Sequence, residues 1–335
     1  MTFLTFRTIF LSTSLALLIG LPAAWLARRL KLLDQPAGEP HKQHALTVPL
    51  AGGLVILIIV LGVALFEGLW NQAAIRSILL PGLIVFAFGL WDDHRHLSAL
   101  WKLVGQLLAT VILILLGVQI RLFDTLPWLN IAITVLWVVG ITNAYNFVDS
   151  MDGLATGLAA LTAAFFMLVT YDSNQLDLSS LSAILVGACI GCFYYTAPPA
   201  KFFLGDSGAQ LLGFLLAGLA IAYNPLGFLR IQSWYVPILL LGVPIFDMIL
   251  VVYSRLRRGK PVYQAGRDHT YHRLVALGLD TNRAVLTMQF AALLLGCLAF
   301  IALAQPPLIA NLIFGGCLIA GMAALLILDH RKDRL

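Results

Sequence analysis

The stretch LLPGLIVFAFGLWDD, residues 79–93, is an apolar run that ends in two adjacent carboxylates. Such a run is typical of a helix that spans a membrane or lies in a core. Two adjacent carboxylates near hydrocarbon cost on the order of several kcal/mol unless a cation, a proton or water compensates them. Because a helix end needs at most one capping acid, Asp92 and Asp93 predict a compensating partner. A divalent metal that also binds phosphate is the first candidate.

The composition places the whole chain in the membrane class. Its 335 residues are 60% hydrophobic and only 11% charged, whereas a soluble domain carries about 25% charged residues. Long apolar stretches recur along the chain and predict an all-α, polytopic membrane protein with about eleven transmembrane helices, with about ten as the alternative. The predicted spans are 4–26, 49–67, 77–91, 101–118, 128–142, 153–170, 181–196, 207–223, 235–253, 284–304 and 307–328.

The basic residues are unevenly distributed between the predicted loops. With the N-terminus outside and the C-terminus cytoplasmic, only four of the 21 Lys and Arg residues fall on the outer side, namely Arg7, Arg76, Arg121 and Arg230. This bias agrees with the positive-inside rule. The net charge of +5 is therefore a signal of topology and not of nucleic-acid binding.

In this topology most of the unusual polar residues lie on the cytoplasmic face. We expect a single integral membrane domain, 1–335, whose active-site loops converge there from distant parts of the sequence. Each loop carries carboxylates, amides, lysines or histidines. The loops lie near residues 28–48, 92–100, 143–152, 197–206 and 254–283.

The residue types in these loops suit phosphoryl transfer. That reaction gathers negative charges, which the enzyme must neutralise while it aligns donor and acceptor. Mg²⁺, with Mn²⁺ as an alternative, binds hard oxygens and keeps several waters, so one or two carboxylates plus substrate phosphates suffice. The carboxylates are Asp206, Asp92 and Asp93, and the counter-charges are Lys42, Lys102, His269 and His272.

Several of these residues also have a purely structural interpretation. Asp152 would cap the apolar helix that follows it, and residues 205–208 fit the start of another helix. His269 and His272 are spaced to bind a metal on a helix, although flanking arginines favour an anion. The basic run 255–260 is typical of an anchor at anionic headgroups.

Other polar residues have two interpretations that the sequence leaves open. Asp247 lies inside a predicted span, where an acid either serves function or pairs with a basic group. Asn143 and Asn146 lie three residues apart and so share one helical face, as do Asp149 and Asp152. Their amides would satisfy buried backbone groups or bind a uracil, a sugar or a phosphate.

Taken in order, the loops resemble the polyprenyl-phosphate N-acetylhexosamine-1-phosphate transferases. The resemblance extends from Asp34 to Leu274, and the span count is similar to that of the branch that uses UDP-N-acetylglucosamine. The matching pieces are Asp-x-Pro…Lys…His…Pro…Gly-Gly, Asp92-Asp93 followed by Lys102 and Gln106, Asn143-x-x-Asn146-x-x-Asp149-x-x-Asp152-Gly, Pro-Ala-Lys…Phe-Leu-Gly-Asp206-Ser-Gly, Pro244-x-x-Asp247, and Arg267-Asp-His269-x-x-His272-Arg-Leu.

This resemblance implies a reaction at the inner (plasma) membrane. Undecaprenyl phosphate would attack a UDP-N-acetylhexosamine, release UMP and leave a lipid-linked sugar that starts a cell-envelope glycan. The lipid bilayer is the other partner, and a homodimer is an alternative to a monomer. For the reaction itself, the implied Mg²⁺ ligands are Asp206 and Asp149, and the implied catalytic residues are Asp92, Asp93, Asp149 and Asp152. The implied substrate-binding residues are Lys42, His44, Lys102, Asn143, Asn146, Asp247, Arg267, His269, His272 and Arg273.

The chain departs from the family pattern in the last loop. Gly266 replaces an acid, and Tyr271 replaces the middle histidine of a His-x-His-His run. N-acetylglucosamine and a 6-deoxy-N-acetylhexosamine are therefore both candidate sugars, and the phospho-N-acetylmuramoyl-pentapeptide transferase branch, with its triple histidine, is an alternative. A CDP-alcohol phosphotransferase would need Ala-Arg where residues 156–157 are Thr-Gly, and a secondary transporter would place charges near the bilayer midplane.

Overall fold

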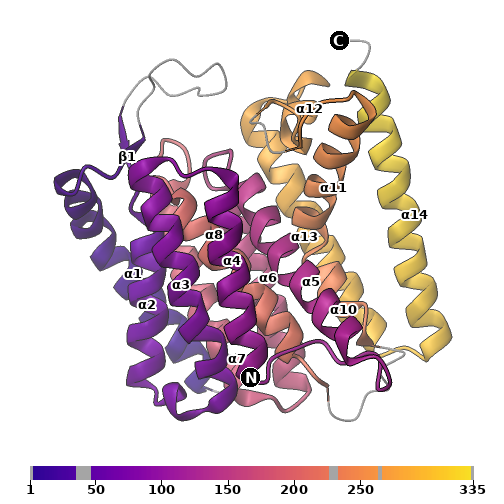
Figure 1. Cartoon of the computed structure of the whole chain (residues 1–335), viewed down its shortest axis with the longest axis horizontal. Helices are drawn as coiled ribbons and strands as arrows, with labels where there is room; N and C mark the ends of the chain where they lie inside the picture. Colours follow the sequence, from indigo (N-terminus) through magenta and orange to yellow (C-terminus); the bar gives the residue numbers. More distant parts are fainter. Residues whose placement is uncertain (1–2, 35–46, 226–232, 263–265, 333–335) are drawn as a thin grey trace. The chain divides into compact units, whose positions relative to one another are not determined.

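The computed structural model describes residues 3–34, 47–225, 233–262 and 266–332, and these residues are mainly helical (Figure 1). Their contacts divide the chain into two compact units, Met1–Asn224 and Pro225–Leu335. The single domain 1–335 therefore stays a prediction.

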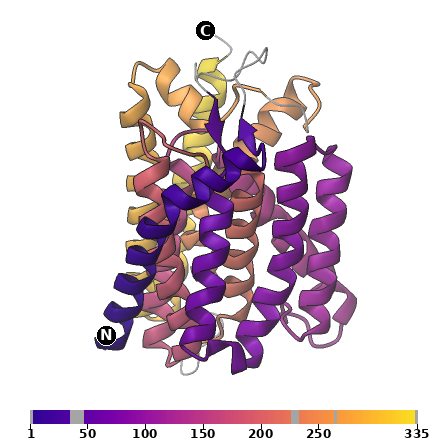
Figure 2. The ribbon, with the colours of Figure 1, turned by 90° about the vertical axis from the view of Figure 1, so that its left-hand side faces the viewer.

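The first unit is a bundle of long helices that run up and down beside one another (Figure 2). A pair of two-residue strands and a 3₁₀ turn, Leu69–Asn71, interrupt the helices. The elements in chain order are α1 (Phe3–Arg29), β1 (Leu33–Asp34), β2 (Val48–Pro49), α2 (Gly52–Phe66), α3 (Ala73–Arg95), α4 (Ala99–Leu115), α5 (Pro127–Val148), α6 (Leu154–Asp172), α7 (Leu176–Thr196) and α8 (Gly205–Ala222).

The second unit is smaller and is also helical. Its described residues form two long helices, α13 and α14, and three shorter ones. The elements are α10 (Val236–Leu240), α11 (Gly242–Arg257), α12 (Thr270–Ala276), α13 (Thr281–Leu303) and α14 (Pro307–Lys332).

The prediction of an all-α, polytopic membrane protein is confirmed. Within the described ranges, eight helices are long and apolar enough to cross a membrane, and α2 and α4 are shorter apolar helices. Exposed side chains such as Leu312 and Ile319 cover α14, as expected for a surface that faces lipid. The count of eleven spans and the orientation stay predictions. The eight long helices are α1, α3, α5, α6, α7, α8, α13 and α14.

The predicted span 235–253 is interrupted in the structure. Helix α10 ends at Leu240 and α11 begins at Gly242. A proline inside a helix lacks the N–H group, and its ring clashes with the carbonyl four residues earlier. For Pro244 that carbonyl belongs to Leu240, so this proline explains the break. A single continuous helix over 235–253 is therefore wrong.

Helix α8 is the most buried of the candidate spans. Every residue from Ser207 to Ala220 is buried, and α3 and α5 pack against the helix. The start of α8 also meets the first loop, because Leu50 pairs with Phe203 in a parallel bridge just after the β1–β2 ladder. The N-terminus of α8 is therefore where several predicted loops come together. Predicted residues Lys42 and His44 lie outside the described residues.

The close approach of α3 to α8 depends on Gly89. A Cβ atom there would lie 2.5 Å from Ser207 Cα and 2.8 Å from Ser207 N. These are backbone atoms of a buried helix, so they cannot move without shifting α8.

We expect Gly89→Ala to lower stability by about 1–3 kcal/mol, because the added methyl group overpacks the α3–α8 contact. The measurement is thermal unfolding in detergent. The matched control is Gly62→Ala, since a Cβ at Gly62 meets nothing within 4 Å and alanine favours the helix. Equal melting temperatures for the two variants would contradict the assignment.

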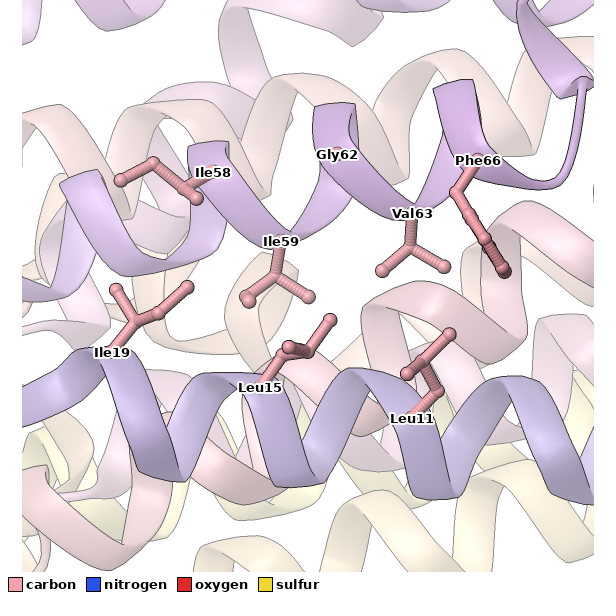
Figure 3. A pocket seen from close by; sticks show the side chains of 8 residues that line it. All are labelled: Leu11, Leu15, Ile19, Ile58, Ile59, Gly62, Val63 and Phe66. Carbon is pink, nitrogen blue, oxygen red and sulfur yellow. The ribbon is translucent and has the colours of Figure 1, made fainter.

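A groove of about 280 Å³ lies between α1 and α2 (Figure 3). All its lining residues are apolar, so it offers no ligand for a phosphate or a nucleotide. It is a surface suited to a lipid tail and is separate from the polar residues described next. Its lining residues are Leu11, Leu15, Ile19, Ile58, Ile59, Gly62, Val63 and Phe66.

Candidate functional site

The adjacent carboxylates at the end of α3 meet a lysine from α4 and an aspartate from α8. The Lys102 ammonium forms an ion pair with Asp92 Oδ2 and another with Asp206 Oδ1, the second at 3.0 Å. Asp92 is almost fully buried, whereas the side chains of Lys102 and Asp206 are 22% and 31% exposed. Lys102 is thus a compensating partner of the kind that the sequence predicts, and it pairs with Asp92 of the two adjacent carboxylates. The solvent-accessible groups of this cluster are the lysine and Asp206.

Asp93 has different partners from Asp92. Its Oδ1 accepts the backbone N–H of Asp206 at 2.7 Å, and its Oδ2 accepts that of Ser207 at 3.2 Å. These N–H groups belong to the first turn of α8 and have no partner within the helix. A carboxylate there also matches the positive end of the helix dipole. Asp93 thus caps α8 from another helix and fixes the position of Asp206.

Gly205 makes this cap sterically accessible. Its φ of +75° is a conformation that glycine adopts readily, and a Cβ atom there would lie 2.9 Å from Asp93 Oδ2. The prediction that residues 205–208 start a helix is confirmed, since α8 begins at Gly205. The glycine also has a site function, because it leaves room for a carboxylate.

The third predicted loop contributes through the end of α5. Asn146 hydrogen-bonds the Asp206 side chain. Helix α5 ends at Val148, so Asp149 and Asp152 lie in the turn that follows and do not share a helical face, contrary to the prediction. The N-cap position of α6 is Gly153, so Asp152 lies one residue before it, and its capping role stays one of the two interpretations.

Asp149 is close to the other carboxylates of the first unit. Its pKa lies well above the usual range, because the carboxyl group is desolvated and faces the negative charges of Asp206, Asp93 and Asp152. Four carboxylates from α3, α8 and the α5–α6 turn therefore influence one another. In the described part of the chain, Lys102 forms an ion pair with one of these carboxylates, Asp206, and another with Asp92.

A layer of amides lies one helical turn below the charged groups. Gln106 Nε2 donates to Gln210 Oε1 at 3.1 Å, and Asn143 Nδ2 donates to Gln106 Oε1 at 2.7 Å. Gln106 follows Lys102 by four residues and Gln210 follows Asp206 by four, so each amide shares a helical face with a charged residue. This layer joins α4, α5 and α8. The sequence analysis did not select Gln210, although its four-residue spacing from Asp206 is a signal.

The donor set of the first unit fits a hard divalent cation. Within the described residues no group of three or more His, Cys, Asp or Glu side chains is arranged to hold a metal on its own. Asp206 and Asp92 do flank one cation, the Lys102 ammonium. Mg²⁺ needs only one or two carboxylates when substrate phosphates and water complete its coordination. The accessible carboxylate of Asp206, with Asp149 close to it, is the best candidate ligand.

The second unit contains a separate polar cluster around Asp247. This carboxylate is fully buried; its Oδ2 lies 2.8 Å from His269 Nδ1, and its Oδ1 accepts the N–H of Thr270 at 2.6 Å. Of the two interpretations of Asp247, pairing is the one observed. His269 is the N-cap residue of α12, and its Nδ1 is engaged with Asp247.

His272, the other predicted histidine of this segment, packs against Tyr271, which replaces the histidine expected between His269 and His272. Tyr271 OH lies 2.6 Å from His272 Nε2, and the two rings are 3.9 Å apart. The centroids of the His269 and His272 rings are 5.8 Å apart. Tyr271, which stands where the family pattern has a histidine, therefore restrains the His272 ring. Arg267 is exposed at the start of this segment.

Several arginines of the second unit form an ion network around two buried carboxylates, Asp268 and Asp329. Arg255 and Arg258 pair with Asp268, and Arg257 and Arg258 pair with Asp329. A basic run that only anchors the protein at lipid headgroups would not be enclosed in this way. The interpretation of 255–260 as a simple headgroup anchor is therefore wrong for Arg255, which is 5% exposed.

Arg273 is also part of this network. It is 3% exposed, and its Nη1 donates to Asp329 Oδ1 and to the Leu328 carbonyl, both at 3.1 Å. Its Nε donates to the Asp268 carbonyl at 3.0 Å. Its Nη2 is buried and has no hydrogen-bond partner among the described residues. The role of Arg273 in donor binding stays a prediction.

Comparisons with known proteins agree with the order of these motifs. A sequence model of glycosyl transferase family 4 matches residues 75–224. A probable undecaprenyl-phosphate N-acetylglucosaminyl 1-phosphate transferase of Bacillus subtilis is 31% identical over 274 residues, 78% of this chain and 75% of that protein. A decaprenyl-phosphate N-acetylglucosaminephosphotransferase of Mycobacterium tuberculosis is 29% identical over 354 residues, 93% of this chain and 86% of that protein.

A third relative represents the alternative branch. A phospho-N-acetylmuramoyl-pentapeptide-transferase of Halalkalibacterium halodurans is 28% identical over 299 residues, which cover 81% of this chain and 89% of that protein. The resemblance that the loop motifs predict is thereby confirmed.

Proposed function

Since the chain belongs to glycosyl transferase family 4, we propose that it transfers a hexosamine 1-phosphate from a UDP-sugar to a polyprenyl phosphate. The observation that carries the proposal is the bridge of Lys102 between Asp92 and Asp206, which joins the consecutive helices α3 and α4 to α8, a helix far from them in sequence. The names of the relatives support undecaprenyl or decaprenyl phosphate as acceptor and N-acetylglucosamine as the first candidate sugar.

The proposed reaction is a displacement at phosphorus. An oxygen of the polyprenyl phosphate forms a bond to the β-phosphorus of the UDP-sugar, and the bond from that phosphorus to the oxygen bridging the α-phosphate breaks. UMP leaves with that oxygen, and the lipid carries the sugar on a diphosphate. Because both reactants are anionic, the site must supply positive charge and alignment.

The residues of the first unit have distinct proposed roles. Lys102 neutralises phosphate charge, and Asp206 with Asp149 would hold Mg²⁺, which would neutralise diphosphate oxygens when bound. Asp92, which shares Lys102 with Asp206, would activate the lipid phosphate. Asn143, Asn146 and Asp152 would organise the nucleotide and diphosphate. Asp93 holds the start of α8.

The second unit would contribute to donor binding. His269 is oriented by Asp247, and His272 and the exposed Arg267 lie in the same short segment. For the orientation in the membrane, we propose an N-terminus outside, a cytoplasmic active site and the inner membrane as location, on the basis of the loop charges.

The proposed function is tested with a panel of UDP-sugars. Membranes that contain the protein are expected to release UMP only when polyprenyl phosphate and Mg²⁺ are both present, and a chelator is expected to abolish release until Mg²⁺ or Mn²⁺ is restored. Lipid-linked product is measured for UDP-N-acetylglucosamine, a 6-deoxy analogue and UDP-N-acetylmuramoyl-pentapeptide. Product from the last donor alone would favour the other branch, and no product from any donor would leave the transporter hypothesis.

A further inference from the structure

We propose that Asp329, near the end of α14, is a positioning residue for donor binding. Through Arg273 it holds the segment that carries His269. The inference rests on the proposed function of that segment and adds a residue outside the predicted active-site loops. In the second unit, α11, α12 and the end of α14 pack against one another (Figure 1).

Asp329 is a buried carboxylate that pairs with three guanidinium groups. It is 3% exposed and lies 2.8 Å from Arg257 Nε, 3.3 Å from Arg258 Nη2 and 3.1 Å from Arg273 Nη1. Removing one partner of a buried charge group leaves the others uncompensated. Asp329 is therefore the group on which the positions of these arginines depend most.

Arg273 connects Asp329 to Asp268, the residue before His269. Its Nη1 binds Asp329 and the Leu328 carbonyl, while its Nε binds the Asp268 carbonyl. A planar guanidinium with a fixed fork of donors defines both distance and angle between its acceptors. The backbone at Asp268 is therefore fixed relative to the end of α14.

The same short segment is held from α11 as well. The Asp268 side chain pairs with Arg255 at 3.3 Å and Arg258 at 3.6 Å, and Asp247 binds His269 and the N–H of Thr270. Asp268, His269 and Thr270 are thus all held by residues of α11. Asp268 is also linked to α14 through Arg273. Loss of the α14 side would let the segment rotate about its Asp247 contacts.

Helix α14 has a second attachment that allows a matched control. Only 6% of the apolar stretch of α14 is buried within the protein, so few packing contacts hold this helix. Near its other end, the Phe314 ring lies 4.9 Å from that of Trp234 and 5.5 Å from that of Tyr235. An aromatic contact and an ionic contact therefore attach the same helix at different points, and each can be removed separately.

The experiment compares Asp329→Asn with Phe314→Ala in the full-length protein. Asp329→Asn is expected to raise the KM for the UDP-sugar about tenfold, with the KM for polyprenyl phosphate within about twofold of the wild-type value. Asp329→Glu should restore part of the loss. Phe314→Ala should lower the melting temperature and leave both KM values within about twofold. Equal changes in both KM values, or the same donor KM for the two variants, would overturn the proposal.

A second measurement separates this inference from the proposed function. Amide hydrogen exchange over residues 266–276 is expected to be faster in Asp329→Asn than in the wild type, and unchanged in Phe314→Ala. If the wild type transfers no sugar, the proposed function fails while faster exchange still supports the anchor. If exchange is unchanged in Asp329→Asn, the anchor is refuted whatever the activity.

Discussion

Asp206→Asn is expected to reduce sugar-phosphate transfer by a factor of about 10³, an effect of the size seen when a preorganised electrostatic contact to the reacting groups is lost. Asparagine keeps the volume of the side chain but removes the charge that faces Lys102 at 3.0 Å. It also removes the most accessible carboxylate proposed to bind Mg²⁺. The rate is measured as lipid-linked sugar formed in membranes at saturating donor and acceptor.

The control for this prediction is Asp280→Asn. Asp280 is an exposed carboxylate that caps α13 and pairs with Arg283, and asparagine is an equally good cap. We expect this variant to transfer at the wild-type rate. Raising the Mg²⁺ concentration should restore part of the activity of Asp206→Asn if the lost group is a metal ligand, whereas full turnover at ordinary Mg²⁺ would remove the metal assignment.

The fold was largely predictable because apolar length and charge bias act over whole segments. The predicted spans coincide with helices, and the eight long ones confirm the polytopic class. The break at Leu241 was missed because hydropathy averages over a window and does not register one missing N–H at Pro244. Its position follows from local backbone sterics.

The identity of the site residues was easier to predict than the role of each residue. Asp92 and Lys102 were selected from one loop and Asp206 from a distant one, and the structure brings the three together. Which carboxylate caps α8 could not be predicted, because the choice depends on the approach of α3 to α8 at Gly89. Gln210 and Asp329 were missed for a related reason. Each acts through a partner on another helix, and a single sequence contains no record of such contacts.

The two adjacent aspartates should respond differently to the same substitution. Asp92→Asn is expected to lower transfer about 10²–10³-fold with little change in the melting temperature, because it removes a charge beside Lys102 and leaves the helix contacts intact. Asp93→Asn should instead lower stability by about 1–3 kcal/mol in addition to activity. The asparagine oxygen can accept one N–H of α8, but its amide group would face the other.

The comparison is decisive because both residues are buried and differ in their partners. Asp93 binds Asp206 N and Ser207 N, while Asp92 binds Lys102 and accepts the N–H of Leu97 at 2.5 Å. Thermal unfolding measures the structural part, and transfer at a temperature where all variants are folded measures the chemical part. A stable but inactive Asp93→Asn beside an active Asp92→Asn would reverse the assignment. The nucleophile side would then belong to Asp93, and the Lys102 bridge would serve structure alone.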